Sequence, residues 1–540
     1  QIFRAIGRHA VGEAGELSWR FAWNNAQLQY DEHRWFVGSE NLQTAGYTLT
    51  DDAYIVLDRP GVVDFSLAGP IIDEAEVRAK SAVEQGVAIG ADYQHALFSS
   101  FDVKIGGQWR RTERDNDILK DRYDTSSGAQ APAISASAVF KDTPVGEVPF
   151  MDISAAQLEA QVGGTIRSIL PYNALESFVD SVIEDYSITE AVSAAYVMGE
   201  YDKGPLTIVG GVRMEHTEQE LSGNSLTADL FRGRPTMDSI AANKREHDDT
   251  SWLPMVAATY RPTPEWAIRA GAGKRLGRAD FDLIAPRAGV DIDRDEITLR
   301  VSNPELKPRK STNYDLSVEY YPSEGQVFGV SFFRRDIKDD IISRTDEVTR
   351  EVFSDELSEF NIPESPIFGF FERFFVGTVD NIQSYQVDGV EIFAATTIPK
   401  VPAPFDQIHL HGTVTFIDEN GEISRDGRTE PASLPEQTDM TASFAVSYED
   451  ERTTLWAGYR YNGGYLSSLK GRVRDDLYQS ESHTLDAKVK WQVSDRWTFL
   501  LDGRNLTDEL QFEYQSPDVR QKSLAERFGR RVYTGFQYKW

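Results

Sequence analysis

The chain ends in the stretch Val532-Tyr533-Thr534-Gly535-Phe536-Gln537-Tyr538-Lys539-Trp540, and this stretch decides the fold. In an extended strand, successive side chains point to opposite faces, so every second residue from Val532 shares one face. That face is apolar and ends in two aromatic rings, whereas the other face carries Gln537 and Lys539. The pattern is typical of the last strand of a membrane-spanning β-barrel, and an edge strand of a soluble sandwich is the alternative.

The same alternation recurs along the chain, in Leu206–Glu215, Asn313–Tyr321, Met440–Tyr448 and Leu485–Val493. Within the last of these segments, Leu485, Val489 and Trp491 are expected to face lipid. Asp486 and Lys488 are expected to face the lumen. A membrane barrel also concentrates aromatic residues near its strand ends. The residues at such places are Tyr320, Tyr448, Tyr459, Tyr461, Trp491 and Trp497.

Connections of two lengths separate these segments. Tight turns are expected at Asp202–Gly204, Arg261–Glu265, Pro322–Glu324, Glu449–Arg452 and Val493–Arg496. Long polar segments lie near 114–190, 217–250, 276–310, 336–384, 417–436, 462–481 and 505–528. Short turns at one end and long loops at the other are typical of outer-membrane barrels, whose long loops lie outside the cell. The predicted fold is therefore all-β, a transmembrane antiparallel β-barrel of the bacterial outer membrane.

Composition limits the classes of function. The net charge is −30, with 86 acidic against 56 basic residues, so nucleic acid is excluded as a partner because its phosphates would be repelled. Without any cysteine, the chain has no thiolate metal ligand, cysteine nucleophile or disulfide. No nucleophile elbow, phosphate loop or metalloprotease motif appears, so the sequence predicts no enzyme, no catalytic residue and no cofactor.

Counting the alternating segments gives about seventeen strands. The first, near Phe3–Val11, and the last, Arg530–Trp540, run in the same direction, so they cannot pair antiparallel with each other. Barrels of about 22 strands are the plugged transporters. We therefore expect this chain to be the C-terminal part of a 22-stranded barrel, with five strands supplied from upstream and no plug domain in residues 1–540.

Several motifs carry a resemblance to a known family. They are Asn303–Pro308, Ser311–Tyr321, Phe332–Ile341, Tyr385–Glu391, Asn505–Glu509 with Gly529–Arg531, and Arg269–Pro286. In this order they resemble the barrel of TonB-dependent receptors, most closely the large Caulobacter- and sphingomonad-type subfamily. The residues themselves suggest structural roles, because Pro304 and Pro308 stop strand pairing and Asn505 and Asp508 suit a turn. Gly389 suggests a bulge or a close approach to the lumen wall.

The resemblance implies active uptake of a scarce, bulky small molecule, either an oligosaccharide or a metal chelate such as a siderophore. It also implies a TonB-type energy-transducing partner that acts through a plug, which would lie upstream or on another chain. Outer-membrane lipid and lipopolysaccharide are the other expected partners. A passive porin, or a surface receptor without energy coupling, is the alternative.

The segment Pro363–Phe375 is the best candidate for substrate recognition. It carries Phe368, Phe370, Phe371, Phe374 and Phe375 in an expected outer loop. Exposed phenylalanines would stack on sugar faces or bind an apolar chelate, and a small hydrophobic core within the loop is the alternative.

Other residues are weaker candidates for ligand binding. His409 and His411 share one strand face, which suggests either a metal pair or two positions of the lumen wall; no metal site is predicted. The acidic segments Asp336–Asp340 and Asp346–Glu359 suggest a rim that divalent cations bridge to lipopolysaccharide. Ala155–Ile188 is expected to be partly helical and to form an outer lid or a plain surface loop.

Overall fold

The computed structural model is built almost entirely from one large antiparallel sheet. It describes residues 1–39, 47–49, 55–57, 70–125, 160, 163, 165–226, 240–293, 296–359, 362, 371–398, 401–425, 428–431, 433–470, 473–515 and 521–540. Within these residues, no helix is long and apolar enough to cross a lipid bilayer.

In the described residues, seventeen strands each pair antiparallel with the next, as the sequence predicts. The sheet has 20 strands in all, because the short strands β11 (Ala288–Asp293), β12 (Glu296–Val301) and β17 (Arg428–Pro431) attach to it. The seventeen are β1 (Ile2–Val11), β2 (Gly15–Ser39), β5 (Pro70–Phe98), β6 (Phe101–Asp124), β7 (Tyr186–Lys203), β8 (Leu206–Leu226), β9 (Ile240–Thr263), β10 (Trp266–Gly277), β13 (Arg309–Tyr320), β14 (Val327–Val348), β15 (Arg373–Thr397), β16 (Ile408–Arg425), β18 (Met440–Glu449), β19 (Thr453–Asn462), β22 (Ser482–Gln492), β23 (Trp497–Arg504) and β26 (Arg531–Tyr538).

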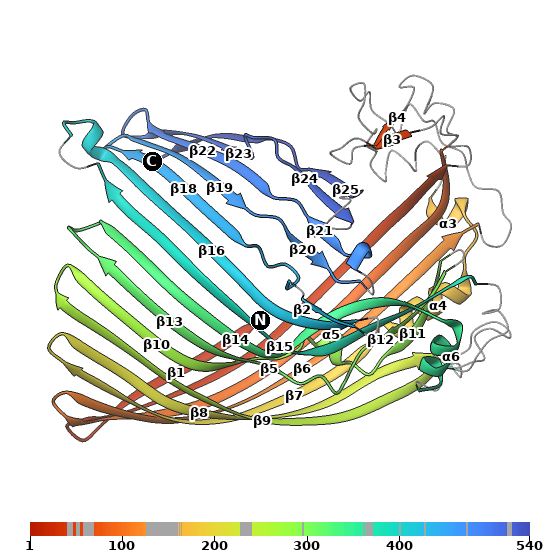
Figure 1. Ribbon diagram of the computed structural model, residues 1–540, viewed down its shortest axis with the longest axis horizontal. Helices are drawn as coiled ribbons and strands as arrows, with labels where there is room; N and C mark the ends of the chain where they lie inside the picture. The colour runs from red at the N-terminus through yellow and green to blue at the C-terminus, as the bar shows by residue number, and fades with distance from the viewer. Residues whose placement is uncertain are drawn as a thin grey trace.

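Short and long connections alternate along the sheet. The short turns, such as those after β1, β5, β7 and β9, gather at the left end of Figure 1, and the helices lie toward the other end. The helices are α3 (Ile166–Ile169), α4 (Ala174–Ile183), α5 (Phe281–Ile284) and α6 (Arg350–Glu359), with short 3-10 turns η5 (Phe405–Gln407) and η6 (Val473–Asp475). The connections also contain a hairpin, β3 (Tyr47–Leu49) with β4 (Ile55–Leu57), and a small sheet of β20 (Tyr465–Ser468), β21 (Leu477–Gln479), β24 (Leu510–Gln515) and β25 (Gln521–Arg527).

The strands next to the N-terminus are longer than the pattern predicts. Strands β5 and β6 have 29 and 24 residues, although about 10 residues suffice to cross a bilayer. Strands β6 to β9 and β14 to β15 therefore continue into segments that were expected to be loops, and the connection between β2 and β5 was missed. Helices α3 and α4 lie within the segment 155–188, where partial helix was expected.

The two faces of the sheet differ in the way the sequence predicts. Leu316, Phe332, Val390 and Phe416 lie directly opposite one another across β13 to β16. Side chains converge on the concave face, so the residues there are more buried. On β13, Asn313 is 5% exposed, whereas Tyr314 is 46% exposed. The apolar face is therefore the outward one, and the polar face lines the lumen.

The strand β22 has the predicted register. Val489 lies opposite Leu455 and Leu501 on the apolar face. Lys488 lies on the other face, opposite Trp456 and Asp502, with its Nζ 3.7 Å from Asp502 Oδ2. Aromatic rings gather at the short-turn ends, where Trp497 packs against Phe536 and Tyr538.

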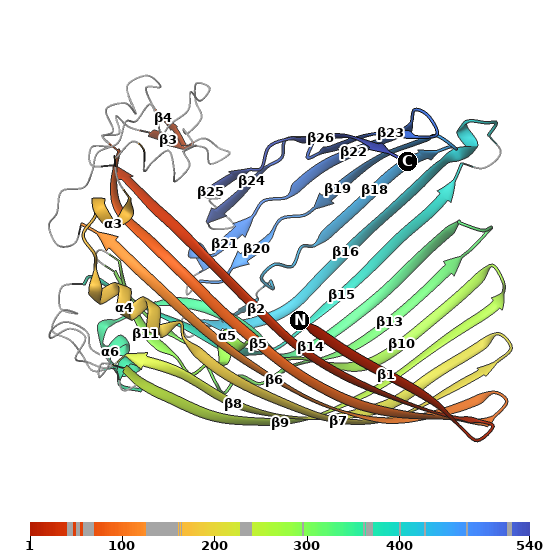
Figure 2. The same cartoon turned by 180° about the vertical axis from the view of Figure 1, so that it is seen from behind.

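The two outermost strands of the sheet stay apart. Within the described residues, β1 pairs only with β2, and β26 pairs only with β23. Figure 2 shows β1 and β26 at the two borders of the curved sheet. Because seventeen strands alternate in direction, these two run the same way and cannot close an antiparallel ladder. Closure of the barrel by further strands stays a prediction.

Two positions have the local geometry expected of them. Gly389 keeps the regular register of β15, and a Cβ there would collide with the Phe333 ring, so the close approach is the correct interpretation and the bulge is not. Asn505 and Asp508 have φ of 51° and 57°, and the Asn505 side chain accepts the Glu509 N–H at 2.9 Å. Both asparagine and aspartate tolerate this left-handed backbone in turns.

Candidate functional site

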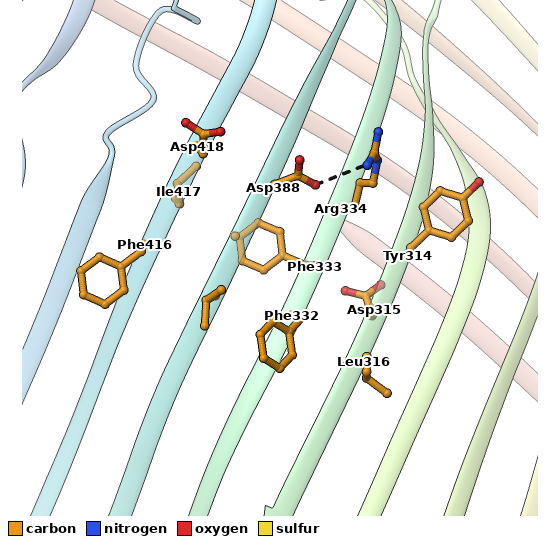
Figure 3. A pocket seen from close by; sticks show the side chains of 12 residues that line it. Tyr314, Asp315, Leu316, Phe332, Phe333, Arg334, Asp388, Phe416, Ile417 and Asp418 are labelled. Atoms are coloured by element: carbon orange, nitrogen blue, oxygen red, sulfur yellow. Dashed lines mark ion pairs between the residues drawn. The ribbon is translucent and has the colours of Figure 1, made fainter.

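The outward face has a hollow of about 510 Å³ across β13 to β16. One wall is the apolar row of Leu316, Phe332, Val390 and Phe416, and the other wall is the row of Tyr314, Arg334, Asp388 and Asp418 (Figure 3). Both rows lie on the lipid-facing side, because each is two residues from the other along every strand. The hollow therefore marks the outer border of the apolar belt, where charged side chains begin.

Arg334, the cation of the charged wall, is paired with carboxylates. Arg334 Nε lies 3.1 Å from Asp336 Oδ1 and 4.0 Å from Asp388 Oδ1. Asp336 belongs to the acidic segment Asp336–Asp340 that is expected to meet lipopolysaccharide. In the structure it pairs with Arg334, and contact with lipopolysaccharide stays a prediction. We therefore assign this outward hollow to the border of the membrane-facing belt.

A second cavity, of about 770 Å³, opens on the lumen face. Its walls come from β5, β6, the junction between α4 and β7, and the segment that contains α5. The lining residues are Lys80, Arg110, Arg114, Asn116, Ile118, Glu184, Tyr186, Glu190, Arg278, Ala279, Asp280, Phe281, Asp282 and Arg287. Five of these side chains are cationic, although the whole chain carries a net charge of −30.

One side of this lumenal cavity is an ion-pair network around Arg278. Its Nη2 donates to Glu215 Oε2 at 2.7 Å and to Thr217 Oγ1 at 2.8 Å. Glu190, only 4% exposed, accepts from Arg110 Nη2 at 3.0 Å and lies 3.8 Å from Arg278 Nε. Arg278 therefore fixes two carboxylates that would be costly to bury alone. It lies within the family-like stretch Arg269–Pro286, but its role depends on contacts across β7 and β8 that sequence spacing does not reveal.

The helix α4 lines the free edge of β6, beyond Asn116, where pairing with β7 ends. Ser177 Oγ, Ser181 Oγ and Asp185 Oδ1 accept the backbone N–H groups of Arg122, Lys120 and Ile118, each at 2.8 Å. Four residues of helix rise about 6.0 Å and two residues of strand about 6.7 Å, so the spacings match. Side chains of α4 thus take the place of a neighbouring strand.

Charge reinforces this contact at its cavity end. Glu184 lies 2.8 Å from Arg78 Nη2 and 2.5 Å from Lys120 Nζ. Burial raises the pKa of Asp185 to about 6. Burial thus makes the charged form of Asp185 less favourable than it would be in water.

Arg287 follows α5 and lines the same cavity. Its Nη1 donates to the Glu184 carbonyl oxygen at 3.3 Å and its Nη2 to the Asp282 carbonyl oxygen at 2.6 Å. The guanidinium also lies 5.1 Å from the centre of the Tyr186 ring. Burial lowers the pKa of Arg287. Arg287 was not predictable as a site residue, since an isolated arginine in a long connection has no distinguishing sequence pattern.

The phenylalanine segment divides between packing and exposure. Phe374 is 6% exposed and packs 5.2 Å from Phe353, centroid to centroid, in a hydrophobic cluster shared by α6, β11 and β12. Phe371 packs against the same cluster, and Phe375 lies under the Arg373 guanidinium at 4.8 Å. Phe374, which lies in β15, therefore packs against α6 and also against β11 and β12, which belong to another connection. Phe368 and Phe370 lie outside the described residues, and ligand binding by this segment stays a prediction.

The two histidines line a third hollow, of about 330 Å³, on the lumen face. His409 and His411 lie opposite Ser447 and Ala445, and Trp456 is also part of the wall. The pair therefore occupies adjacent positions of one strand face, as expected. Across the described ranges, three or more His, Asp or Glu side chains never come together in a way that could hold a metal ion.

Solved structures share this fold. The ferric-catecholate import receptor Fiu of E. coli K12 superimposes with a TM-score of 0.61 at 13% identity, covering 100% of this chain and 64% of that one. The copper transporter OprC gives 0.55 at 12% identity, with 99% and 65% covered. The ferric yersiniabactin uptake receptor FyuA of Yersinia pestis gives 0.53 at 13% identity, with 99% and 60% covered.

The chain thus spans less than two thirds of the length of these structures. No match was found among curated proteins. A family model described as "TonB dependent receptor-like, beta-barrel" matches residues 67–506, well over half of the chain. Together with the seventeen-strand meander and its apolar outward face, this match identifies the chain as a member of the TonB-dependent receptor β-barrel family of the bacterial outer membrane.

Proposed function

We propose that this chain forms the wall of an outer-membrane transporter that takes up a scarce, bulky nutrient with energy from a TonB-type partner. The observation that carries the proposal is the lumenal cavity beside α4 and α5, which is polar, about 770 Å³ in volume and placed on the side of the long connections. Substrate sites are concave and combine a few convergent polar groups, as this cavity does.

The kind of nutrient is a metal chelate such as a siderophore, or an oligosaccharide. The chelate agrees with the fold shared with Fiu, a ferric-catecholate import receptor, and FyuA, a ferric yersiniabactin uptake receptor. The oligosaccharide agrees with the resemblance to the Caulobacter- and sphingomonad-type subfamily.

The assembly proposal follows from the two unpaired borders. Further strands, supplied from outside residues 1–540, would pair with β1 and β26, and a plug would fill the lumen and reach the energy-transducing partner. The amide and carbonyl groups at the border of β26 favour this, since exposed strand edges are costly in lipid.

Uptake in a Gram-negative host without chelate receptors of its own tests the function. The complete receptor, expressed under iron limitation, should restore growth on one member of a panel of ferric siderophores, or carbon-limited growth on one oligosaccharide. Growth should stop when the host's TonB-type protein is deleted. Growth that survives this deletion, together with a conducting pore in planar bilayers, would instead support a passive porin.

A further inference from the structure

The lumenal cavity holds more positive charge than its own carboxylates neutralise. Glu184 is already paired with Arg78 and Lys120, neither of which lines the cavity, and Glu190 is paired with Arg110. The remaining acids of the lining, Asp280 and Asp282, are exposed to solvent. Glu184 and Glu190 are therefore already neutralised by neighbouring arginine and lysine side chains.

Three cationic side chains of the lining, Arg287, Lys80 and Arg114, make no hydrogen-bonded ion pair with a described carboxylate. Among the described residues, no carboxylate oxygen lies within 4.0 Å of Arg287 or Lys80. Arg114 has one partner, Glu84, at 3.9 Å, which is beyond hydrogen-bonding distance. Arg287 Nε is buried without any hydrogen-bond partner, and so is Asn116 Oδ1 beside it in the lining. Buried donors in native proteins are nearly always paired, so an unpaired guanidinium N–H indicates a missing acceptor.

The backbone contacts of Arg287 do not neutralise its positive charge. Its two Nη atoms bind carbonyl oxygens, which hold the side chain in place but carry no formal charge. The carboxylates of Asp282, Glu184 and Asp185 act on the Arg287 charge, but none of them lies within 4.0 Å of its guanidinium, whereas a planar oxyanion could pair with it directly. Lys80 and Arg114 lie on the neighbouring strands β5 and β6, also in the lining, and would meet other oxygens of the same ligand.

We infer that this cavity binds an oxyanion-bearing substrate, with Arg287, Lys80 and Arg114 as its counter-charges. The inference rests on the proposed function and narrows its substrate to a carboxylate- or phosphate-bearing molecule, such as an acidic chelate or an acidic saccharide. A neutral saccharide would offer Arg287 and Lys80 no carboxylate or phosphate oxygen as a partner.

Calorimetric titration of the complete receptor in detergent tests the inference with three probes: sodium citrate, sodium phosphate and uncharged maltohexaose. Citrate or phosphate should bind, more weakly as salt concentration rises, and maltohexaose should not. Lys80→Gln should weaken anion binding about tenfold, because it removes one charged contact. Arg287→Gln should weaken it at least as much, and Arg287→Lys should recover part of the loss.

The control variant is Lys104→Gln, which removes the same charge from β6 nearer the short turn and should leave anion affinity unchanged. Lys80 is the decisive position because no structural contact of its side chain would be lost. Tighter citrate binding would indicate a carboxylate substrate, and tighter phosphate binding a phosphorylated one. Absence of anion binding, or anion binding unaffected by Lys80→Gln and Arg287→Gln, would overturn the inference. Uptake that still needs the TonB-type partner would leave the proposed function standing.

Discussion

Packing requires the Phe374 ring to be buried, whereas ligand recognition requires it to be exposed. Its ring lies in the cluster of α6, β11 and β12, so Phe374→Ala should create a cavity and cost about 3–5 kcal/mol of local stability. Hydrogen–deuterium exchange of amides 353–357 should become faster. Phe375→Ala, at the neighbouring and more exposed ring, should change this exchange little. Unchanged exchange in the Phe374 variant would contradict the packing role.

Asp185 gives a residue-scale prediction about pH. Its pKa rises from 3.8 to about 6 on burial, so the folded state holds this proton more tightly than the unfolded chain does. The docking of α4 should therefore be strongest near pH 4 and weaken as the pH rises through about 6. Burial also raises the pKa of Glu176, within α4 itself, which acts in the same direction.

The variant Asp185→Asn keeps an acceptor for the Ile118 N–H but removes the buried charge. It should increase the protection factor of the Ile118 amide at pH 7.5 and flatten its change between pH 4 and pH 6.5. Asp202→Asn, at an exposed position near the end of β7, serves as the control. A lower protection factor of the Ile118 amide at pH 7.5 in Asp185→Asn would contradict this prediction, because it would mean that the charged Asp185 carboxylate stabilises the docking of α4.

At the scale of elements, α4 substitutes for a strand along β6. Ser177→Ala together with Ser181→Ala removes the acceptors of the Arg122 and Lys120 N–H groups. Each buried, unpaired N–H costs about 1–3 kcal/mol, so the exchange of amides 118–122 should accelerate. Ser358→Ala is the matched control, since the Ser358 hydroxyl donates to the Ser354 carbonyl oxygen within its own helix. Equal exchange in both variants would mean that α4 is held by its ion pairs alone.

At the scale of the whole molecule, the sheet should stay open between β1 and β26. Because the chain contains no cysteine, a disulfide within it can form only between introduced cysteines. Leu501→Cys with Thr534→Cys, which lie opposite each other on β23 and β26, should form a disulfide under mild oxidation. Ile6→Cys with Phe536→Cys should not. Cross-linking of the second pair within one chain would show that the seventeen strands close by themselves.

The period-two alternation by itself determined the fold class, the strand number and the side of the sheet that faces lipid. It did so because each residue's face depends only on its position along its own strand. The stretches Leu485–Val493 and Val532–Trp540 illustrate this, and the turn at Asn505 and Asp508 was predictable for the same local reason. The lengths of β5 and β6 were not, because polar strands outside the membrane have no apolar face to mark them.

Only the tertiary structure decided what lies in the lumen. Phe374 was assigned to recognition because its sequence neighbours are aromatic, but its burial depends on α6, β11 and β12, which come from other parts of the chain. Arg278 and Arg287 reach the cavity through long connections and find Glu190, Glu215 and Glu184 on strands and junctions far away in sequence. Such convergence has no sequence period, because it arises where separate connections meet above a curved sheet.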